Sequence, residues 1–521
     1  MSADPSRSMA TLQGPEQHVD QYESDDSEDF SNSDDEGKSA YRKGGYHPVY
    51  TGDVYNDRYT VVKKLGWGHF STVWLAVDSA VPEKDPNKLV ALKIQKSASQ
   101  YTEAAEDEIT LLWAARTNKG DAKKFVVNLL NHFVFHGPNG KHVCMVFEVM
   151  GKNILSLIKK YDYRGIPLDV TKRLAYQILV GLDYLHRRCK IIHTDLKPEN
   201  FLLCLPHELD ITKLNEEAKR LRTKRLRERL TKGLVRYQGK DSSSKANNTS
   251  SSSSSKTSKS KKEKKPEPGI DEGDIKKEAV ETEEGKKRAK LAKTKISDLG
   301  NACWVDKHFT DDITTRQYRS PEVIVGAPYD TSTDIWSIAC IVFELITGDY
   351  LFDPKEDEYG HHSRDEDHLA LIIELLGPMP KKLTKDGKYS KQFFNSKGQL
   401  RNIQQLDSWG LRDVLLEKYK LDPPVAEQLA SFMIPMLELD PSRRCTCFEA
   451  LQQPFLDDVR GDYPCPDIDE EMANLLAKRL TIAEKSSNKA SPPKVEKEAL
   501  PRASLPSVST PSKAKATAPK K

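Results

Sequence analysis

The chain has 521 residues, of which 31% are charged and 37% hydrophobic, and its mean hydropathy is −0.65. A chain this polar does not supply apolar side chains for three or four dense cores, so we expect part of it to be disordered. The net charge of +3 by itself indicates neither a nucleic-acid partner nor a membrane surface. The eight cysteines are scattered, which is typical of a reduced intracellular protein without a disulfide framework.

No segment has the pattern of a targeting or membrane-spanning sequence. Residues 1–35 are polar and acidic and lack the apolar centre of a signal peptide. The most apolar stretch, residues 338–346, is short and contains Glu344, which indicates a core helix and not a membrane span. We therefore expect a soluble protein without a membrane partner.

Composition divides the chain into ordered and disordered segments. Residues 23–29 form an acidic run, residues 250–255 are all serine, and the lysine-rich residues 256–265 follow. Such runs cannot bury enough apolar surface to offset their conformational entropy. We predict disordered segments at 1–55, 205–291 and 478–521, and one ordered domain made of 56–204 and 292–477. A long insert in one surface loop adds little closure entropy to that domain.

The ordered part begins with strands and continues with helices. Apolar runs ending at turn residues predict strands at 59–65, 71–77, 88–95 and 143–149. Helical spacing of apolar residues predicts helices at 102–116, 171–188, 333–347 and 367–376. A β-rich first block followed by a helical second block indicates an α+β fold in two lobes.

A glycine-rich segment lies between the first two predicted strands and reads Leu65-Gly66-Trp67-Gly68-His69-Phe70-Ser71-Thr72-Val73. Two glycines let the backbone bend and approach a phosphate closely, although an ordinary hairpin also uses glycine in its turn. Ser71 stands where a third glycine is usual. A strand after the loop favours the nucleotide-covering loop of protein kinases, whereas a helix would indicate a Rossmann or P-loop site.

Lys93 lies inside the apolar strand Val90-Ala91-Leu92-Lys93-Ile94. A lysine there is costly unless its ammonium is paired or reaches water at the strand edge. The functional interpretation is an ammonium that holds the α- and β-phosphates of ATP and is fixed by a carboxylate on the next helix. Glu108, fifteen positions later and beside apolar residues, is the best candidate, ahead of Glu103 and Glu106.

The segment at 192–200, Ile-His-Thr-Asp-Leu-Lys-Pro-Glu-Asn, holds three chemically useful side chains in close order. Asp195 is placed to accept the proton of an attacking hydroxyl, Lys197 to neutralise charge on the moving phosphoryl group, and Asn200 to ligate Mg²⁺. Asp298, in Ile-Ser-Asp-Leu-Gly, is the second predicted Mg²⁺ ligand. Further on, Glu322 and Arg444 are candidates for a buried structural ion pair.

These pieces follow one another in the order of the protein kinases, and the chain resembles the bilobal protein-kinase fold, with a small β-rich N-lobe and a large helical C-lobe split by a long spacer. Several segments sharpen the resemblance to the SR-protein kinases: residues 192–200, 298–304, 315–322, 334–337, 348–352, 364–377 and 387–390. The long spacer between the catalytic loop and Asp298 is also a feature of that family.

The resemblance implies an ATP- and Mg²⁺-dependent serine/threonine kinase that phosphorylates Arg/Ser-rich segments of splicing factors. It thereby implies a role in mRNA splicing and in the nuclear import of those factors. We expect a monomer in cytoplasm and nucleus that needs no direct nucleic-acid contact. A related kinase with another basic or proline-directed substrate remains an alternative, as does a scaffold with an incidental kinase fold. The presence of Lys93, Asp195 and Asp298 argues against the scaffold.

The resemblance also assigns residues to the adenine and to the substrate. Phe147 would close the back of the nucleotide pocket, while the carbonyl of Glu148 and the amide of Met150 would bind the base. A docking groove for arginine side chains would use Asp349, Asp367 and Glu374, with Lys418 nearby. Asp367 and Glu374 are seven residues apart on a helical pattern and so share one face, which a merely solvated helix would also show.

Thr194 stands directly before Asp195, where regulated kinases place an arginine that needs a phosphate on the activation loop. A neutral threonine creates no such need, so we predict a constitutively active enzyme. The basic run at 219–229 is a candidate for nuclear import or nucleic-acid binding, with a solvated spacer as the alternative. Ser31 and Ser33 precede acidic residues and are candidate phosphate acceptors.

Overall fold

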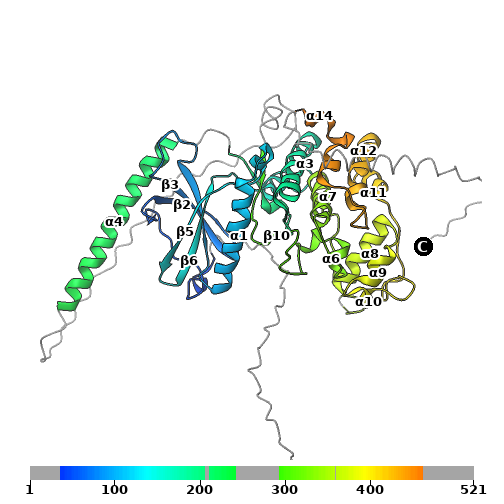
Figure 1. The fold of residues 1–521 in the computed structure, drawn as a ribbon, viewed down its shortest axis with the longest axis horizontal. Helices are drawn as coiled ribbons and strands as arrows, with labels where there is room; N and C mark the ends of the chain where they lie inside the picture. Colours follow the sequence, from blue (N-terminus) through cyan, green and yellow to red (C-terminus); the bar gives the residue numbers. More distant parts are fainter. Residues whose placement is uncertain (1–35, 206–210, 242–292, 358, 462–521) are drawn as a thin grey trace, which may run out of the picture. The chain divides into compact units, whose positions relative to one another are not determined.

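The computed structural model describes residues 36–205, 211–241, 293–357 and 359–461 (Figure 1). Its first part is a six-stranded antiparallel sheet in the order β1-β2-β3-β4-β6-β5. The strands are β1 (Val54–Tyr55), β2 (Tyr59–Trp67), β3 (Ser71–Asp78), β4 (Leu89–Gln95), β5 (Leu129–Gly137) and β6 (Gly140–Glu148). In the described residues no helix is both long and apolar enough to cross a membrane.

The central strand β4 is buried on both of its faces. Leu92 and Val146 belong to the cluster on one face of the sheet. On the other face, Met145 packs in one cluster with apolar residues of α1 (Ser99–Thr117), which runs along the sheet in Figure 1. Burial on both faces explains why β4 is nearly continuously apolar in sequence. Lys93 interrupts this run, so its ammonium needs a partner.

The second part is helical and follows β6. Its helices are α2 (Ile154–Lys160), α3 (Leu168–Asp183) with the π-helical turn η3 (Tyr184–Cys189), α6 (Pro321–Ile324), α7 (Ser332–Thr347), α8 (Arg364–Leu376), α9 (Lys381–Asp386), α10 (Ser390–Phe393), α11 (Leu411–Glu417), α12 (Pro423–Met433), α13 (Cys447–Leu451) and α14 (Asp457–Arg460). Two short strand pairs frame the loops between the lobes: β7 (Ile191–Ile192) with β10 (Cys303–Trp304), and β8 (Phe201–Leu203) with β9 (Thr294–Ile296).

Helices α3 and α7 contact one another and form the centre of the helical core. Residues 332–345 of α7 are all buried, including the acidic residues Asp334 and Glu344, so this helix lies inside the core. The predicted α+β fold with a β-rich N-lobe and a helical C-lobe is therefore confirmed. The sequence analysis did not identify β5, because this edge strand carries half-exposed and polar residues along most of its length.

The prediction of disorder is wrong for residues 36–55. Tyr46 is 3% exposed, Tyr55 lies in β1, and Glu36 forms an ion pair of 2.6 Å with Lys64 on β2. The acidic composition of the preceding residues masked the aromatic side chains that bury this segment on the sheet. The rest of the predicted N-terminal disordered segment, residues 1–35, lies outside the described residues.

The prediction of a spacer disordered from residue 205 is also wrong for α4 (Ile211–Asp241). Four apolar side chains at helical spacing pack this helix against β2 and β3: Ile211, Leu214, Ala218 and Leu221. Arg225 donates a hydrogen bond of 2.8 Å to Asp53 and lies 4.0 Å from the ring centroid of Tyr50. The many charges of this helix hid the narrow apolar stripe. Residues 242–292 and 462–521 lie outside the described residues.

The predicted ion pair between Glu322 and Arg444 is confirmed. The Arg444 guanidinium donates two hydrogen bonds, of 2.7 and 2.9 Å, to the carboxylate of Glu322, and both side chains are completely buried. Arg444 also donates to the carbonyls of Ser332 and Glu438. The pair thereby connects α6 to α7 and to the loop before α13. The residues between Asp298 and Glu322, which lead into α6, are the activation segment.

Replacing one partner leaves the other as an uncompensated buried charge. We expect Arg444→Met to lower the free energy of unfolding by about 3–5 kcal/mol, as measured by urea denaturation. Arg443→Met is the matched control, because the Arg443 side chain is 73% exposed and pairs with Glu438 at the surface; it should cost about 1 kcal/mol or less. Equal losses for both variants would show that burial of the pair does not matter.

Candidate active site

Lys93 joins three separate parts of the chain through its ammonium. The Nζ donates to Glu108 Oε1 at 2.8 Å and Oε2 at 3.0 Å, and to Asp298 Oδ1 at 2.8 Å. Burial alone would lower the pKa of Lys93, but the carboxylates of Asp298 and Glu108 raise it above its ordinary value. Lys93 therefore stays charged, and Glu108 is its helix partner as predicted. Glu103 and Glu106 do not contact it in any described interaction.

The two carboxylates respond differently to this arrangement. Glu108 is 2% exposed, and burial raises its pKa although the charge of Lys93 opposes the shift. The positive charge of Lys93 lowers the pKa of Asp298, whose side chain is 48% exposed. Asp298 is thus held ionised at the open side of the pair, as a cation ligand needs to be.

The backbone of the catalytic loop is fixed by Asp334, a fully buried residue of α7. Its carboxylate accepts hydrogen bonds from the backbone N–H groups of His193 at 2.8 Å and Thr194 at 2.9 Å. It also lies 2.8 Å from Nε2 of His186. Thr194 has a φ of 64°, a strained value for a β-branched residue, and these contacts hold it there. In the sequence, Asp334 belongs only to a segment, 334–337, that carries the family resemblance; its contacts with the catalytic loop come from the tertiary structure.

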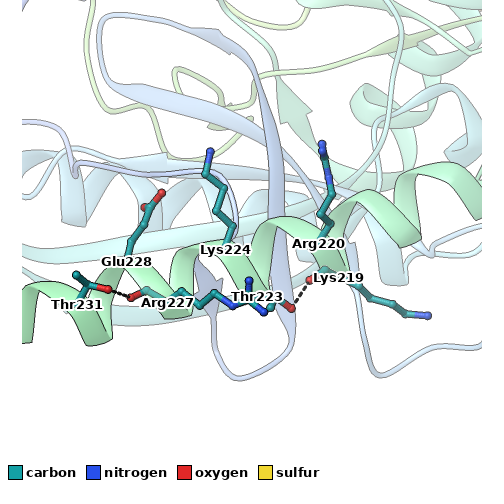
Figure 2. Close-up of a pocket in the computed structure, with 7 residues that line it drawn as sticks. All are labelled: Lys219, Arg220, Thr223, Lys224, Arg227, Glu228 and Thr231. Atoms are coloured by element: carbon teal, nitrogen blue, oxygen red, sulfur yellow. Dashed lines mark hydrogen bonds between the residues drawn. The ribbon is translucent and has the colours of Figure 1, made fainter.

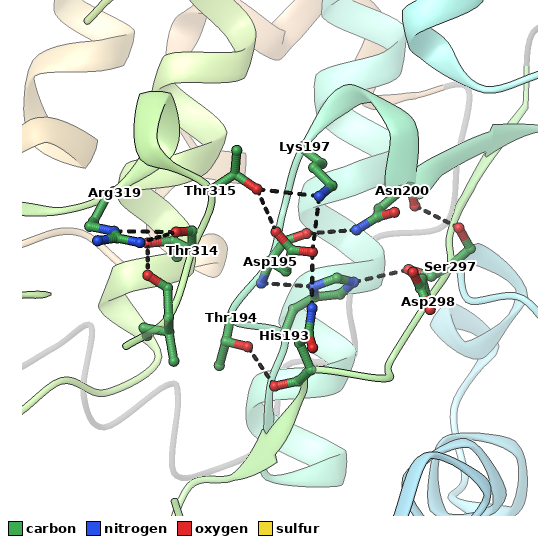
Figure 3. A network of polar contacts seen from close by, with 12 residues as sticks. His193, Thr194, Asp195, Lys197, Asn200, Ser297, Asp298, Thr314, Thr315 and Arg319 are labelled. Carbon is green, nitrogen blue, oxygen red and sulfur yellow. Dashed lines mark hydrogen bonds and ion pairs between the residues drawn. The ribbon is translucent and has the colours of Figure 1, made fainter. Parts of the chain in front are cut away.

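Asp195 projects from this loop into the polar network of Figure 3. Its Oδ1 accepts a hydrogen bond of 2.8 Å from the hydroxyl of Thr315. Its Oδ2 accepts one of 3.1 Å from the Asn301 amide and lies 3.2 Å from Nζ of Lys197. Asn200 donates from its amide nitrogen to the Asp195 carbonyl at 2.8 Å, which leaves the Asn200 side-chain oxygen as an acceptor.

The sequence analysis missed Asn301 and Thr315 as neighbours of Asp195. Asn301 also accepts, with its carbonyl, a hydrogen bond of 2.6 Å from the Thr194 hydroxyl. The Thr315 hydroxyl also accepts a hydrogen bond of 3.3 Å from Lys197. In the sequence, the only indication of these roles is position: Asn301 is three residues after Asp298, and Thr315 is seven residues before Glu322.

The glycine-rich segment Leu65–Val73 forms the hairpin between β2 and β3. A Cβ added at Gly66 or Gly68 would meet no other protein atom within 4 Å, so the fold itself does not require glycine there. The side chains of Leu65, Trp67 and Phe70 are 43%, 45% and 50% exposed. Exposed apolar groups beside unexplained glycines are what a loop that covers a ligand would show.

The residues expected to bind adenine lie at the end of β6. Phe147 pairs with Ala91 of β4 and is partly buried. The Glu148 carboxylate is held by Lys295 at 2.7 Å and by the backbone N–H of Asn128 at 2.8 Å, so its side chain is not available to the base. The roles of the Glu148 carbonyl and the Met150 amide stay predictions.

The four predicted docking residues lie on the helical lobe. Asp349 accepts a hydrogen bond of 2.9 Å from the Tyr419 hydroxyl and lies 3.6 Å from Nζ of Lys418. Asp367 and Glu374 both belong to α8, where Asp367 accepts from the backbone of Lys355 at 2.7 Å. Glu374 accepts from the backbone of residue 407 at 3.0 Å. Each acid thus keeps carboxylate lone pairs for a further donor.

A surface recess lies apart from these groups. It is lined only by residues of α4, drawn in Figure 2: Lys219, Arg220, Thr223, Lys224, Arg227, Glu228 and Thr231. A space bounded by the side chains of one exposed helix has no opposing wall. We therefore assign the nucleotide to the groups around Lys93 and not to this recess.

Asn200 and Asp298 fit a hard divalent cation. Both offer oxygen, and Asp298 is ionised. In the described residues no group of three or more His, Cys, Asp or Glu side chains is arranged for a metal ion. Two protein oxygens suit a cation that completes its shell with water and substrate phosphate, as Mg²⁺ does.

Comparison with known proteins agrees with this geometry. The model of the protein kinase domain matches residues 59–214 and 272–456. A serine/threonine-protein kinase SRPK of Physarum polycephalum is 48% identical over 83% of this chain and 94% of its own length. SRSF protein kinase 3 of Homo sapiens is 40% identical over 80% of this chain and 89% of its own length. This chain belongs to the SR-protein kinase family. It is a protein serine/threonine kinase, and its kinase domain implies ATP and a divalent metal.

Protein kinase dsk1 of Schizosaccharomyces pombe, 41% identical over 82% of this chain and 85% of its own length, belongs to the same comparison. The three relatives match the kinase over most of their length, so the resemblance is not restricted to a shared catalytic core. The predicted family and enzyme class are confirmed.

Below the catalytic loop the kinase buries Glu344 of α7, which is 3% exposed and accepts a hydrogen bond of 2.7 Å from the Tyr318 hydroxyl. Burial raises the pKa of Glu344 to about 7, the hydrogen bond from Tyr318 opposes the shift, and the charge of Glu199 adds to it. The native protein therefore binds this proton more tightly than the unfolded chain does.

This linkage gives a prediction. Stability should fall as pH rises from about 4.5 to about 7, and the loss should persist above pH 7. Glu344→Gln removes the ionisation and keeps an acceptor for Tyr318, so we expect it to be more stable than the parent by roughly 2–3 kcal/mol at pH 8 and equal to it near pH 4. Urea denaturation across pH 4–8 measures this. Glu417→Gln, at an exposed site, is the control; parallel curves for Glu344→Gln and the parent would refute the prediction.

Proposed function

We propose that this kinase transfers the γ-phosphoryl group of ATP to serines in Arg/Ser-rich segments of splicing factors. The observation that carries the proposal is the pairing of Lys93 with both Glu108 and Asp298 beside Asp195, in a chain whose relatives include SRSF protein kinase 3. Neither the alternative of a different substrate class nor that of an inert scaffold gains support from these contacts.

The chain's residues divide the chemistry among them. Lys93, fixed by Glu108, orients the nucleotide phosphates. Asp195, held in place by Asn301 and Thr315, accepts the hydroxyl proton of the substrate serine as the new O–P bond forms. Lys197 lies beside this carboxylate and offsets the negative charge of the transferred group. Asn200 and Asp298 would hold a Mg²⁺ ion, which would supply charge neutralisation at the phosphates.

Carboxylates on the helical lobe support recognition of an arginine-rich substrate. Arginine pairs with carboxylates through two parallel hydrogen bonds, which fixes register as well as affinity. Asp349, Asp367 and Glu374 are candidates for this pairing because each has lone pairs free of its present partners. Lys418 lies 3.6 Å from Asp349 and would give up this contact when an arginine binds.

Regulation of mRNA splicing and of the nuclear import of these substrates would follow from the modification. We propose that the kinase works as a monomer in cytoplasm and nucleus, without direct contact with nucleic acid. By resemblance to the family, we assign control of this partition to the spacer at residues 205–291.

We also propose that the enzyme is constitutively active. Thr194 leaves no unpaired cation before Asp195. The activation segment is held by its own contacts: Arg319 donates to the Thr314 carbonyl at 2.9 Å, and Arg316 pairs with Asp365. Electrostatic repulsion that a phosphate would relieve is therefore absent from these described contacts.

Substitution of activation-segment threonines tests this. Thr310→Ala should leave kcat within about twofold of the parent, because Thr310 is exposed. Thr315→Ala should lower kcat about tenfold or more, since Asp195 and Lys197 lose a shared hydroxyl, and Thr315→Ser should restore it. Constitutive activity would be contradicted if Thr310→Ala had a much lower kcat than the parent and if the parent owed its higher kcat to a phosphate on Thr310.

The function itself is tested by transfer of labelled phosphate to an Arg-Ser peptide, with Ser-Pro and acidic peptides for comparison. We expect transfer only to the Arg-Ser peptide, and none with Asp195→Ala. Reversing the charge at Asp349, Asp367 and Glu374 should raise the KM for the peptide at least tenfold and leave the KM for ATP unchanged. Equal use of all three peptides would overturn the substrate proposal, and an unchanged peptide KM would remove the groove.

A further inference from the structure

A second cavity, of about 400 Å³, lies on the N-lobe away from the groups around Asp195. It is an open recess bordered by two stretches of chain. Ser39, Ala40, Arg42, Lys43, Gly44 and Gly45 come from the N-terminal segment, and Lys96, Ala98, Gln100 and Tyr101 come from the end of β4 and the start of α1. Unlike the recess on α4, this cavity has walls on both sides.

The side chains that line the cavity are positively charged or neutral. Three of its lining residues, Arg42, Lys43 and Lys96, are cationic, and no aspartate or glutamate lines it. In the described part of the chain none of the three forms an ion pair with a carboxylate. Burial and the neighbouring charge of Arg42 lower the pKa of Lys96. The like charges therefore repel one another, and a bound anion would relieve the repulsion.

Lys96 is held at the cavity by aromatic rings. Its Nζ lies 4.6 Å from the ring centroid of Tyr46 and 5.5 Å from that of Tyr101. Such contacts orient an ammonium without neutralising it. Lys96 thus keeps hydrogen-bond donors for a further acceptor.

The start of α1 adds a second contribution at the same place. This 19-residue helix begins after Ala98, whose methyl side chain cannot accept a hydrogen bond from the first backbone N–H groups. The first turn of the helix contains no acidic residue. The N–H groups of a first helical turn and the positive end of the helix dipole attract anions. Ala98 and Gln100 line the cavity, so this end of the helix faces the same space as Lys96.

We propose that this cavity is a binding site for a phosphate monoester, the phosphate group of a phosphoserine. A dianion with three acceptor oxygens matches three cations and a helix N-terminus better than a single carboxylate does. The site would be regulatory, because its walls contact two elements of the proposed nucleotide site, the glycine-rich hairpin and α1. The hydroxyl of Tyr46 donates to the carbonyls of Gly68 at 2.7 Å and His69 at 3.2 Å, and α1 carries Glu108.

The contacts between the cavity and the nucleotide site rest on the proposed function. They predict that a phosphate bound in the cavity lowers the KM for ATP, because it holds Lys96, Tyr46 and the start of α1 in place. Binding of the phosphate itself does not depend on catalysis. It is therefore measured without nucleotide, and failure of the kinase assay and failure of this site are distinguishable.

The phosphoserine has two possible sources, the chain's own N-terminal segment and another protein. Ser33 is three residues before Glu36 in the sequence, and the Glu36 carboxylate forms an ion pair with Lys64. Burial raises the pKa of Tyr46, and the charge of Glu36 raises it further, so Glu36 lies near Tyr46. Three residues span at most about 10 Å. The chain length between positions 33 and 36 therefore allows a phosphate on Ser33 to come within about 10 Å of Glu36, the first described residue of this segment.

The experiment uses the full chain and a fluorescent peptide that copies residues 27–38 with phosphate on Ser33, and it measures binding by anisotropy without nucleotide. We expect the phosphorylated peptide to bind at least tenfold more tightly than the unphosphorylated one and to be displaced by inorganic phosphate. The triple variant Arg42→Gln, Lys43→Gln, Lys96→Gln should lose this preference. Lys84→Gln, at an exposed N-lobe lysine, should retain it. Thermal unfolding checks that each variant folds.

Two further chains separate the sources. If the segment binds in cis, a chain carrying phosphoserine at position 33 should fail to bind the peptide, while Ser33→Ala binds it; if the ligand comes from another protein, both chains bind. Equal affinity for the phosphorylated and unphosphorylated peptides, or an unchanged preference in the folded triple variant, would overturn the site.

Discussion

The ammonium of Lys93 is the constraint on which the active site depends. A charged group inside an apolar strand is tolerated only when it is paired, and two carboxylates from distant parts of the chain provide this pairing. The requirement positions α1, through Glu108, against the sheet and brings Asp298 to the same point. One electrostatic need therefore aligns three elements that sequence separates by as many as 205 residues.

A second buried charge fixes the other half of the site. Asp334 of α7 accepts from the backbone of His193 and Thr194, so the most buried helix of the C-lobe determines the path of the catalytic loop. Asp195 is then held by short hydrogen bonds from the activation segment and from Asn301. Positioning by neutral hydroxyl and amide groups, without a phosphate, is the physical basis for the proposed constitutive activity.

Two additions outside the kinase core contact the nucleotide-binding lobe. The segment from Glu36 reaches the glycine-rich hairpin through Tyr46 and borders the cationic cavity. Helix α4 covers the outer parts of β2 and β3, and Val149, next to Glu148, packs in the same cluster. Both additions thus contact elements of the proposed nucleotide site. The segment from Glu36 and helix α4 could therefore influence nucleotide binding although neither carries a catalytic residue.

The sequence by itself determined the fold class, the family and the chemical groups of the site. Lys93, Asp195, Asn200 and Asp298 stand at motif positions whose chemistry is local and whose order along the chain is specific. It also offered Glu322 and Arg444 as candidates for a buried ion pair, which the structure contains.

Only the tertiary structure decided which partners hold these groups. Thr315 and Asn301 act on Asp195 across more than 100 residues of sequence, a distance over which no periodic pattern carries information. The ordered parts of residues 36–55 and of α4 were hidden for another reason. Their few apolar side chains are outnumbered by charges, and such segments are stable only where the sheet offers a surface on which to bury them.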